Sequence, residues 1–498
     1  MNFRRASGVL LHPTSLPGPH GSGDLGASAY HFVDWLLSAG QSLWQVLPLG
    51  GIGPGNSPYM ASSAFAGNEL LIDLHELHEK GWLDADALRA DLVFPPRRVD
   101  YSAVVPWRMQ RLRVAASAFA AGADAGQRDD FAEFCERNAD WLDDYALFMA
   151  LAEDQAWRDW SSWDPLLAAR APEALRAAAA EHRQAIAARK FCQWCFHRQW
   201  TNLKDYANLR GVRIVGDMPI FVALQSADVW SRPELFELDA TGQPTVVAGV
   251  PPDFFSATGQ RWGNPLYRWA AHADEGYAWW VARMRHSCAL LDLVRVDHFR
   301  GFAGCWEIPA AESTAMVGRW TPGPGAALFD AVAAALGKPA IIAEDLGVIT
   351  PDVDALRRQL GFPGMRILQF AFGGDASNAY LPHNYERNTV VYTGTHDNTT
   401  TRGWWQEASV AERHHACDYL NCDGSVIEQD LLRAACASVA DTAIHPMQDL
   451  LGLDAASRMN LPGEARGYWE WRFEWDQVEP EHAQRLHNWC RLYRRTPA

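Results

Sequence analysis

The sequence predicts an α/β fold of the (β/α)8 type, a parallel barrel with helical and irregular insertions between its strands. Eight short apolar runs lie near residues 8, 43, 213, 293, 341, 367, 390 and 443, and helical patterns separate most of them. An acid follows three of these runs: Asp297, Glu344 and Asp397, spaced about 50 residues apart. Because strand ends surround one mouth in a barrel, these acids are expected to meet there.

The first elements form a βαβ unit. An apolar run near residue 8 is followed by turn residues and by a helical pattern over residues 27–39, in which Phe32 and Trp35 lie on the apolar side. Gly40 ends that pattern, and a second strand is expected over residues 42–48. Strand, helix and strand within about 40 residues are typical of a parallel sheet.

An open, doubly wound sheet is the competing architecture. No G-x-G-x-x-G motif follows any of the predicted strands. That motif is the fingerprint of dinucleotide binding in such sheets, so its absence favours the barrel.

The rhythm of strands and helices divides the chain into three parts. Residues 1–69 form the first part of the barrel, and residues 70–205 form a mainly helical, Ala-rich insertion. Residues 206–498 form the remainder of the barrel, with a loop insertion at about 224–270 that is rich in Pro, Gly and aromatic residues. The segment 172–210 has no internal Pro or Gly, which favours continuous helix.

Composition excludes several kinds of partner. The chain has 60 acids against 44 Lys and Arg, a formal charge of −16. Nucleic acids and anionic membrane surfaces require a basic face, so neither is an expected partner. A neutral sugar is compatible with this charge. Most of the 23 Trp are expected in the core, and several are expected to line a carbohydrate groove.

Cysteine usage indicates a reducing compartment. Nine cysteines are scattered without regular spacing, and Cys192 and Cys195 form a single C-x-x-C with no second pair to complete a zinc site. We interpret this pair as structural. The sequence shows no signal-peptide pattern and no run of 18 apolar residues, so a cytoplasmic location is expected. No G-x-x-x-x-G-K-[ST] motif is present, and no cofactor is predicted.

The acids at the strand ends suit glycosidic bond chemistry. Residues two apart on a strand share a face, so Arg295 and Asp297 project together. The guanidinium is expected to lower the pKa of Asp297, which suits a nucleophile. Glu344 has no basic neighbour in sequence, and other acids are expected to raise its pKa, which suits a general acid. The alternative is that the acids cap helices.

Asp397 is a third acid that can hold sugar hydroxyls as the transition state forms. His298 and His396 each flank an acid, and we interpret them as hydrogen-bonded side chains. No H-x-x-x-H pair or other metal spacing accompanies them, so no metal site is predicted.

Several motifs carry a resemblance to a known family. They read V-P-P-D-F-F-S-A-T-G-Q-R-W-G-N-P at 250–265, R-V-D-H-F-R-G at 295–301, A-E-D-L-G at 343–347 and T-G-T-H-D-N at 393–398. Shorter matches are N-S-P-Y at 56–59, S-A-F-A-G-N at 63–68, G-D-M-P-I-F-V at 216–222 and N-L-P-G at 460–463. In this order, the motifs resemble those of the 4-α-glucanotransferases (amylomaltases, disproportionating enzymes) of glycoside hydrolase family 77. Residues 85–190 match least.

The resemblance implies that the protein transfers α-1,4-glucan segments between maltooligosaccharides through a covalent glycosyl-enzyme. It puts Asp297 at the nucleophile position, Glu344 at the acid/base position and Asp397 at the transition-state stabiliser position. It also implies substrate-contacting residues, which are Tyr59, Asp217, Arg295, His396, Phe254, Gln260, Trp262 and Asn460. Many relatives have Tyr where this chain has Phe254, so a hydroxyl is lost there.

Two other functions fit part of the pattern. An α-amylase-type hydrolase would use the same three acids, and a non-catalytic glucan-binding module would need only the aromatic residues. Incubation with maltotriose separates them, because transfer yields glucose and longer oligomers whereas hydrolysis yields only shorter sugars. The oligomeric state is not determined by the sequence.

Overall fold

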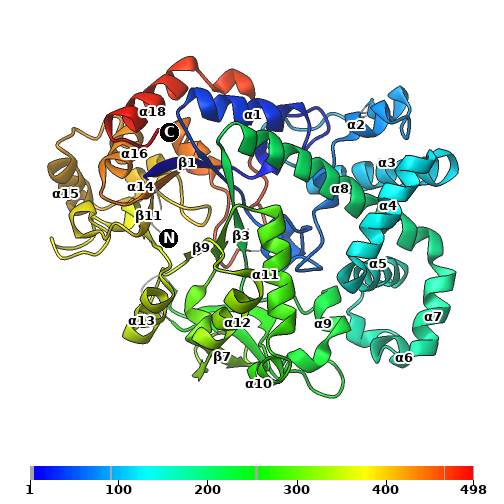
Figure 1. Cartoon of the computed structure of the whole chain (residues 1–498). Helices are drawn as coiled ribbons and strands as arrows, with labels where there is room; N and C mark the ends of the chain where they lie inside the picture. The colour runs from blue at the N-terminus through cyan, green and yellow to red at the C-terminus, as the bar shows by residue number, and fades with distance from the viewer. Residues whose placement is uncertain (1–4, 90–91, 253–255, 465, 497–498) are drawn as a thin grey trace.

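Eight parallel strands form the centre of the molecule, as predicted (Figure 1). The computed structural model describes residues 5–89, 92–252, 256–464 and 466–496. The strands are β1 (Ala6–Leu10), β2 (Leu43–Gln45), β3 (Arg213–Met218), β6 (Leu293–Val296), β9 (Ile341–Ala343), β10 (Gly364–Ile367), β11 (Thr389–Tyr392) and β12 (Thr442–Pro446). Each falls on one of the eight predicted apolar runs.

The strand order is that of a barrel. Hydrogen bonds join β10, β11, β12, β1, β2, β3, β6 and β9 in that sequence, and every pair is parallel. The first and last strands of this order also meet, because the Ala343 amide of β9 donates to the carbonyl of Pro363, the residue just before β10, at 2.9 Å. The open doubly wound sheet is therefore wrong.

The side chains of β2 are buried on both faces of the barrel wall. Trp44 is fully buried, meets the ring of Phe32 in the helix Ala27–Ser38 edge-on with centroids 5.1 Å apart, and donates its indole N–H to the Leu11 carbonyl at 2.7 Å. Its neighbour Gln45 points to the opposite face, into the barrel, and accepts a hydrogen bond from the Tyr392 hydroxyl at 2.8 Å. These strands are covered on both faces, which explains why they read as short apolar runs and not as alternating ones.

Helices cover the outside of the barrel (Figure 1). Those that follow barrel strands are α1 (Ala27–Ser38), α8 (Arg183–Leu209), α11 (Ala278–Leu290), α12 (Ala326–Leu336), α13 (Pro351–Leu360), α14 (Thr401–Glu407), α15 (Val410–Leu420), α16 (Ile427–Ala437), α17 (Met447–Leu450) and α18 (Pro480–Leu492). The last helix, α18, packs on α1 and α16 and so joins the two ends of the chain.

The segment between β2 and β3 is mainly helical, and most of it lies to one side of the barrel (Figure 1). It contains α2 (Leu74–Glu79), α3 (Tyr101–Gly122), α4 (Ala125–Arg137), α5 (Ala139–Asp154), α6 (Pro165–Ala168) and α7 (Pro172–Glu181). Helix α8 contacts both α1 and α11 of the barrel. The division at residues 69 and 205 stays a prediction. Cys192 and Cys195 are buried free thiols within α8.

The sequence did not predict a second, smaller sheet. Strands β4 (Val246–Val250), β5 (Gln260–Pro265), β7 (Gly304–Pro309) and β8 (Arg319–Pro322) pair antiparallel in the order β5, β4, β7, β8. The short helix α9 (Ala227–Ser231) precedes β4 in the sequence, and α10 (Trp269–Asp274) follows β5. The insertion expected as loop at 224–270 thus supplies two strands, and the segment after β6 supplies the other two. Among the described residues, no helix is long and apolar enough to span a membrane.

The contact between β1 and β2 gives a test of the barrel core. Gly8 pairs with Leu43, and a Cβ added at Gly8 would lie 2.5 Å from the Leu43 Cβ and 2.7 Å from its carbonyl oxygen. Gly8→Ala is therefore expected to destabilise the protein by about 1–3 kcal/mol, because backbone must shift to accept the methyl group. Thermal unfolding measures this.

The control for this prediction is Gly122→Ala. Gly122 is the last residue of α3, and an added Cβ there meets nothing within 4 Å. Its melting temperature is expected to stay the same or rise slightly, since Ala is the better helix former. Equal melting temperatures for the two variants would contradict the packing argument.

Candidate active site

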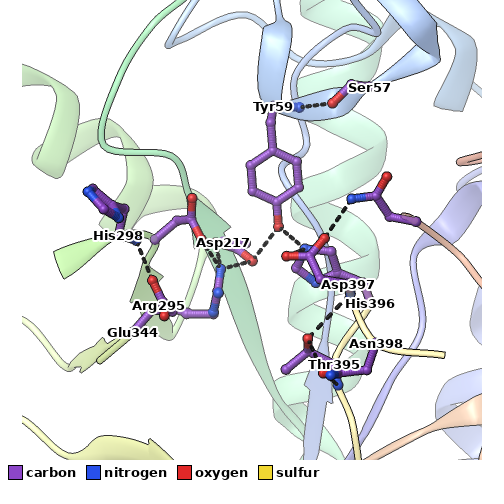
Figure 2. Close-up of polar contacts among 12 residues, drawn as sticks. Ser57, Tyr59, Asp217, Arg295, His298, Glu344, Thr395, His396, Asp397 and Asn398 are labelled. Carbon is purple, nitrogen blue, oxygen red and sulfur yellow. Dashed lines mark hydrogen bonds and ion pairs between the residues drawn. The ribbon is translucent and has the colours of Figure 1, made fainter. Parts of the chain in front are cut away.

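The three predicted acids lie at the same end of the barrel, and Figure 2 shows Glu344 and Asp397 there. Asp297 directly follows β6, Glu344 directly follows β9, and Asp397 lies in the turn after β11. The strands are parallel, so their C-terminal ends share one face of the barrel. The structure therefore brings together the acids that the sequence singled out.

Arg295 is the central cation of this cluster. In the paired strands β3 and β6, Asp217 lies opposite Arg295, and the Arg295 Nη1 atom is 2.7 and 2.6 Å from the two Asp217 carboxylate oxygens. The same nitrogen lies 2.9 Å from Asp297 Oδ1. Although burial lowers the pKa of Arg295, these carboxylates raise it well above its ordinary value. One buried guanidinium therefore stays charged between two acids.

Tyr59 reaches this cluster from the loop after β2. Its hydroxyl donates to Asp217 Oδ2 at 2.8 Å and lies 2.8 Å from His396 Nε2. Burial, and then Asp217, raise the pKa of Tyr59 well above its usual range, so the hydroxyl keeps its proton. Burial lowers the pKa of His396, although Asp397 opposes this shift. A neutral ring with its proton on Nε2 can donate to the Tyr59 hydroxyl while that hydroxyl donates to Asp217. The two rings stack with centroids 5.3 Å apart.

Backbone amides hold Glu344. Its Oε2 accepts from the His298 amide at 2.8 Å, and its Oε1 accepts from the Leu346 amide at 2.8 Å. His298 has φ 50°, a left-handed conformation that a non-Gly residue adopts at some energetic cost, and it begins the 3-10 turn η8 (Phe299–Phe302). Burial raises the pKa of Glu344, although Arg295 and the two amides oppose the shift. The predicted direction for Glu344 is confirmed.

The prediction for Asp297 was wrong. The sequence suggested that Arg295 would lower its pKa, whereas burial raises it to about 8, and the charges of Asp217, Glu344 and Asp397 add to this. Arg295 does lower it, but the guanidinium also contacts both oxygens of Asp217. One positive charge shared among several buried acids does not offset the loss of water around them.

Asp397 is the most open of the three acids, with 41% of its side chain exposed. Its Oδ1 accepts from Asn460 Nδ2 at 2.6 Å, and the Asn460 amide donates to the His396 carbonyl at 3.0 Å. Arg458 donates to the Asp397 and Asn460 carbonyls. A segment more than 60 residues away in the chain therefore fixes the orientation of this carboxylate.

Trp262 and Gln260 lie on β5, on the side of the cluster where Glu344 lies. The Trp262 indole N–H donates to Gln260 Oε1 at 3.1 Å, and its ring meets the His298 ring edge-on with centroids 4.7 Å apart. His298 in turn holds Glu344 through its amide. Phe254, the third residue predicted from this part of the chain, lies outside the described residues.

Sequence reasoning missed two contributors to the site. Arg458 orients Asp397, and its position two residues before the N-L-P-G motif was a usable signal. Trp469 packs its ring against Tyr59 and His396, with centroids 5.6 and 5.8 Å away. Nothing in the local sequence marks Trp469, because its role comes from loops that meet only in the fold. Among the described residues, no cluster of His, Cys, Asp or Glu has the arrangement of a metal site.

The geometry defines a class of protein. Two carboxylates lie at neighbouring strand ends of a parallel barrel, with a third acid and aromatic rings beside them. This arrangement is typical of enzymes that break and re-form glycosidic bonds. Burial raises the pKa values of both Glu344 and Asp297, and the Arg295 guanidinium contacts Asp297.

Comparison with known proteins gives the particular family. Residues 11–477 match the family profile described as 4-alpha-glucanotransferase, glycoside hydrolase family 77. The chain is 49% identical to the 4-alpha-glucanotransferase of Thermus thermophilus over 98% of both chains, and 49% identical to that of Synechocystis over 95% of both. An amylomaltase structure from Streptococcus agalactiae in complex with acarbose superposes with a TM-score of 0.96 at 38% identity, covering 99% of this chain and 100% of that one.

The chain therefore belongs to glycoside hydrolase family 77, the 4-α-glucanotransferases. It is an enzyme with 4-α-glucanotransferase activity on α-1,4-glucans.

The raised pKa of Asp297 has a consequence for stability. Burial raises the pKa of Asp297 to about 8 in the folded protein, whereas the unfolded chain releases this proton near the ordinary pKa of 3.8. Stability contributed by this group is therefore lost as the pH rises between those values. Asp297→Asn is expected to raise the melting temperature relative to the parent by about 1–3 °C more at about pH 8 than at about pH 5.

Differential scanning calorimetry at both pH values measures this effect. Asp205→Asn, at an exposed position on α8, serves as the control and is expected to show the same difference from the parent at both. A gain for Asp297→Asn that does not change with pH would show that the ionised acid carries no folding penalty.

Proposed function

We propose that Asp297 attacks the anomeric carbon of an α-1,4-glucan and forms a covalent glycosyl-enzyme. The observation that supports this most directly is the 2.9 Å contact between Arg295 Nη1 and Asp297 Oδ1, which stabilises the carboxylate anion and aims it. Asp217 also binds the Arg295 guanidinium, and the Tyr59 hydroxyl donates to Asp217. A nucleophile fixed in this way loses little conformational entropy when the sugar binds.

Glu344 is the acid and then the base in this proposal. Raised pKa values for both carboxyls keep a proton in the cleft near neutrality. In the reacting complex we assign that proton to Glu344, because Asp297 has the guanidinium contact that its anion needs. Glu344 gives the proton to the leaving 4-oxygen as the glycosidic bond breaks and the bond from Asp297 to the anomeric carbon forms. It then takes the proton of the incoming 4-hydroxyl, whose oxygen bonds to the anomeric carbon as the bond from that carbon to Asp297 breaks.

Asp397 stabilises the transition state, in which positive charge spreads over the sugar ring. Its exposed carboxylate is held by Asn460 and is close enough to Asp297 to raise the pKa of that acid. The remaining predicted contacts to the sugar are assigned to Tyr59, Asp217, Arg295, His396, Gln260, Trp262, Asn460 and Phe254. The substrates that we propose are maltooligosaccharides, which supply both the donor and the acceptor.

Transfer requires the acceptor sugar to react faster than water. A hydroxyl held in place gains an effective concentration worth roughly 7–11 kcal/mol in favourable cases, which offsets the abundance of water. Trp262 is well placed to hold the acceptor, because its ring packs against His298 next to Glu344. We therefore assign Trp262 to the acceptor side of the cleft.

We also propose that the enzyme acts in the cytoplasm. All nine cysteines are free thiols, which suits a reducing compartment.

Substitution of the two carboxylates tests the assigned roles. Asp297→Asn is expected to reduce disproportionation of maltotriose below detection while amylose binding is retained. Glu344→Gln is expected to lower the rate by about 10²–10⁴, because general acid–base assistance is lost. Product chromatography measures turnover, and mass spectrometry of the intact Glu344→Gln protein is expected to show a trapped glycosyl adduct. Full activity in either variant would remove its assigned role.

Replacement of Trp262 tests the acceptor side. Trp262→Ala is expected to raise the ratio of hydrolysis to transfer about 3-fold or more, because a poorly held acceptor loses effective concentration. Trp262→Phe keeps a flat ring against His298 and is the matched control, with a ratio close to that of the parent. Reducing-end release compared with chain redistribution gives the ratio, and an unchanged value in Trp262→Ala would count against this role.

A further inference from the structure

A large aromatic ring lies exposed on the edge of the small sheet. Trp320, on the edge strand β8, is 42% exposed. The Trp306 ring of β7 packs against it edge-on, with centroids 5.3 Å apart. The Trp306 indole N–H donates to the Ala315 carbonyl at 3.0 Å, whereas the Trp320 N–H has no protein acceptor among the described residues. Trp306 is thus part of the packing, and Trp320 is presented to solvent.

The Trp320 ring is held in place from one side. The Arg300 guanidinium lies 3.8 Å from the ring centroid, a cation–π contact, and Arg300 is itself buried. Arg300 also donates to the Val348 carbonyl. Arg300 and Trp306 together hold the ring, and the part of Trp320 that stays exposed is a preorganised surface for a ligand to stack on.

Three further apolar side chains are exposed in the segments that contact Trp306 and Arg300. Met316 is 59% exposed, Val317 is 53% exposed and Val348 is 54% exposed. The loop that carries Met316 and Val317 packs on Trp306, since a Cβ added at Gly318 would lie 2.5 Å from that indole. We call Trp320, Met316, Val317 and Val348 the Trp320 platform.

Two chain segments link the platform to Glu344. Val348 lies four residues after Glu344 in the loop that follows β9, and Arg300 lies two residues after His298, whose amide holds Glu344. The platform's sheet also carries Gln260 and Trp262 on β5. Two separate chain segments thus lead from Glu344 to Trp320.

We propose that the Trp320 platform binds glucose units of the α-1,4-glucan chain on the leaving-group side, beyond those next to the cleaved bond. This rests on the proposed role of Glu344, since the acid must face the leaving oxygen. The apolar C–H face of a glucose unit stacks on the exposed part of the indole, whose N–H is available to donate to a sugar hydroxyl. A neutral chain emerging from the cleft meets these groups without any charge to desolvate.

A second copy of this chain is the alternative occupant. A stable protein interface buries about 800 Å² on each partner, which is more than four side chains on one edge strand and its neighbouring loop provide. A polysaccharide chain needs only one flat ring for each sugar that it contacts. The area and the two chain segments that link the platform to Glu344 therefore favour the glucan.

The test compares donors of different length in Trp320→Ala. The ratio of kcat/KM for amylose to kcat/KM for maltotriose is expected to fall about 5-fold, because only the long chain reaches the platform. Trp320→Phe, which keeps a flat ring, is expected to retain most of the ratio. Trp157→Ala is the matched control, since Trp157 is 59% exposed but lies in the helical insertion, and its ratio is expected to equal that of the parent.

A binding measurement separates affinity from turnover. In the Asp297→Asn background, Trp320→Ala is expected to weaken amylose binding about 5-fold by calorimetry. Trp320→Leu, which keeps apolar bulk without a flat ring, is expected to show the same loss and serves if Trp320→Ala lowers the melting temperature. An unchanged amylose-to-maltotriose ratio in both variants, or an equal fall in Trp157→Ala, would overturn the proposal.

Two further outcomes are informative. If the parent protein elutes as a dimer and Trp320→Ala as a monomer, the platform is an interface between copies and the proposal fails. If Glu344→Gln keeps full activity, the proposed function fails, and the length dependence of Trp320→Ala then reports binding near a different acid. The two failures are thus distinguishable.

Discussion

The charge of Arg295 is the constraint on which the active site depends. The guanidinium is buried, and it lies within 2.9 Å of Asp217 and Asp297. Without it, Asp217 and Asp297 would lose the cation that contacts both, and Glu344 would lose a positive charge that lowers its pKa. With it, burial still raises the pKa values of Asp297 and Glu344, because one charge serves several acids. The cleft therefore retains a proton at a pH where isolated carboxyls are ionised, and acid catalysis needs that proton.

The rest of the site is built from loops that rely on the barrel for their position. Tyr59 extends from the loop after β2 to bond Asp217 on β3, and Asn460 crosses from the C-terminal region to bond Asp397 after β11. Left-handed backbone at His298 turns its amide toward Glu344. Each contact ties together segments far apart in sequence. The rigid strand ends supply the reacting groups, and the loops supply their orientation and the walls of the cleft.

The small antiparallel sheet extends this arrangement away from the barrel. Its strand β5 carries Trp262 against His298, and its far edge carries Trp320, fixed by Arg300. The small sheet thus carries Trp262 near Glu344 and Trp320 farther from it. A polymer substrate gives a reason for such a design, because binding energy gathered at remote sugar units can be used at the cleaved bond.

The sequence by itself determined the barrel, its eight strands and the three acids at their ends. Buried parallel strands read as apolar runs whatever surrounds them, and an acid directly after such a run is a local signal. The tertiary structure alone decided the small sheet, the contacts of Arg458 and Trp469, and the direction of the pKa of Asp297. Strands β4 and β5 lie in a segment rich in Pro and Gly, and β4 pairs with β7 from beyond β6, so no local pattern predicts them. The pKa depends on burial and on how many acids share one guanidinium, and both are properties of distances in space that neighbours in sequence do not fix.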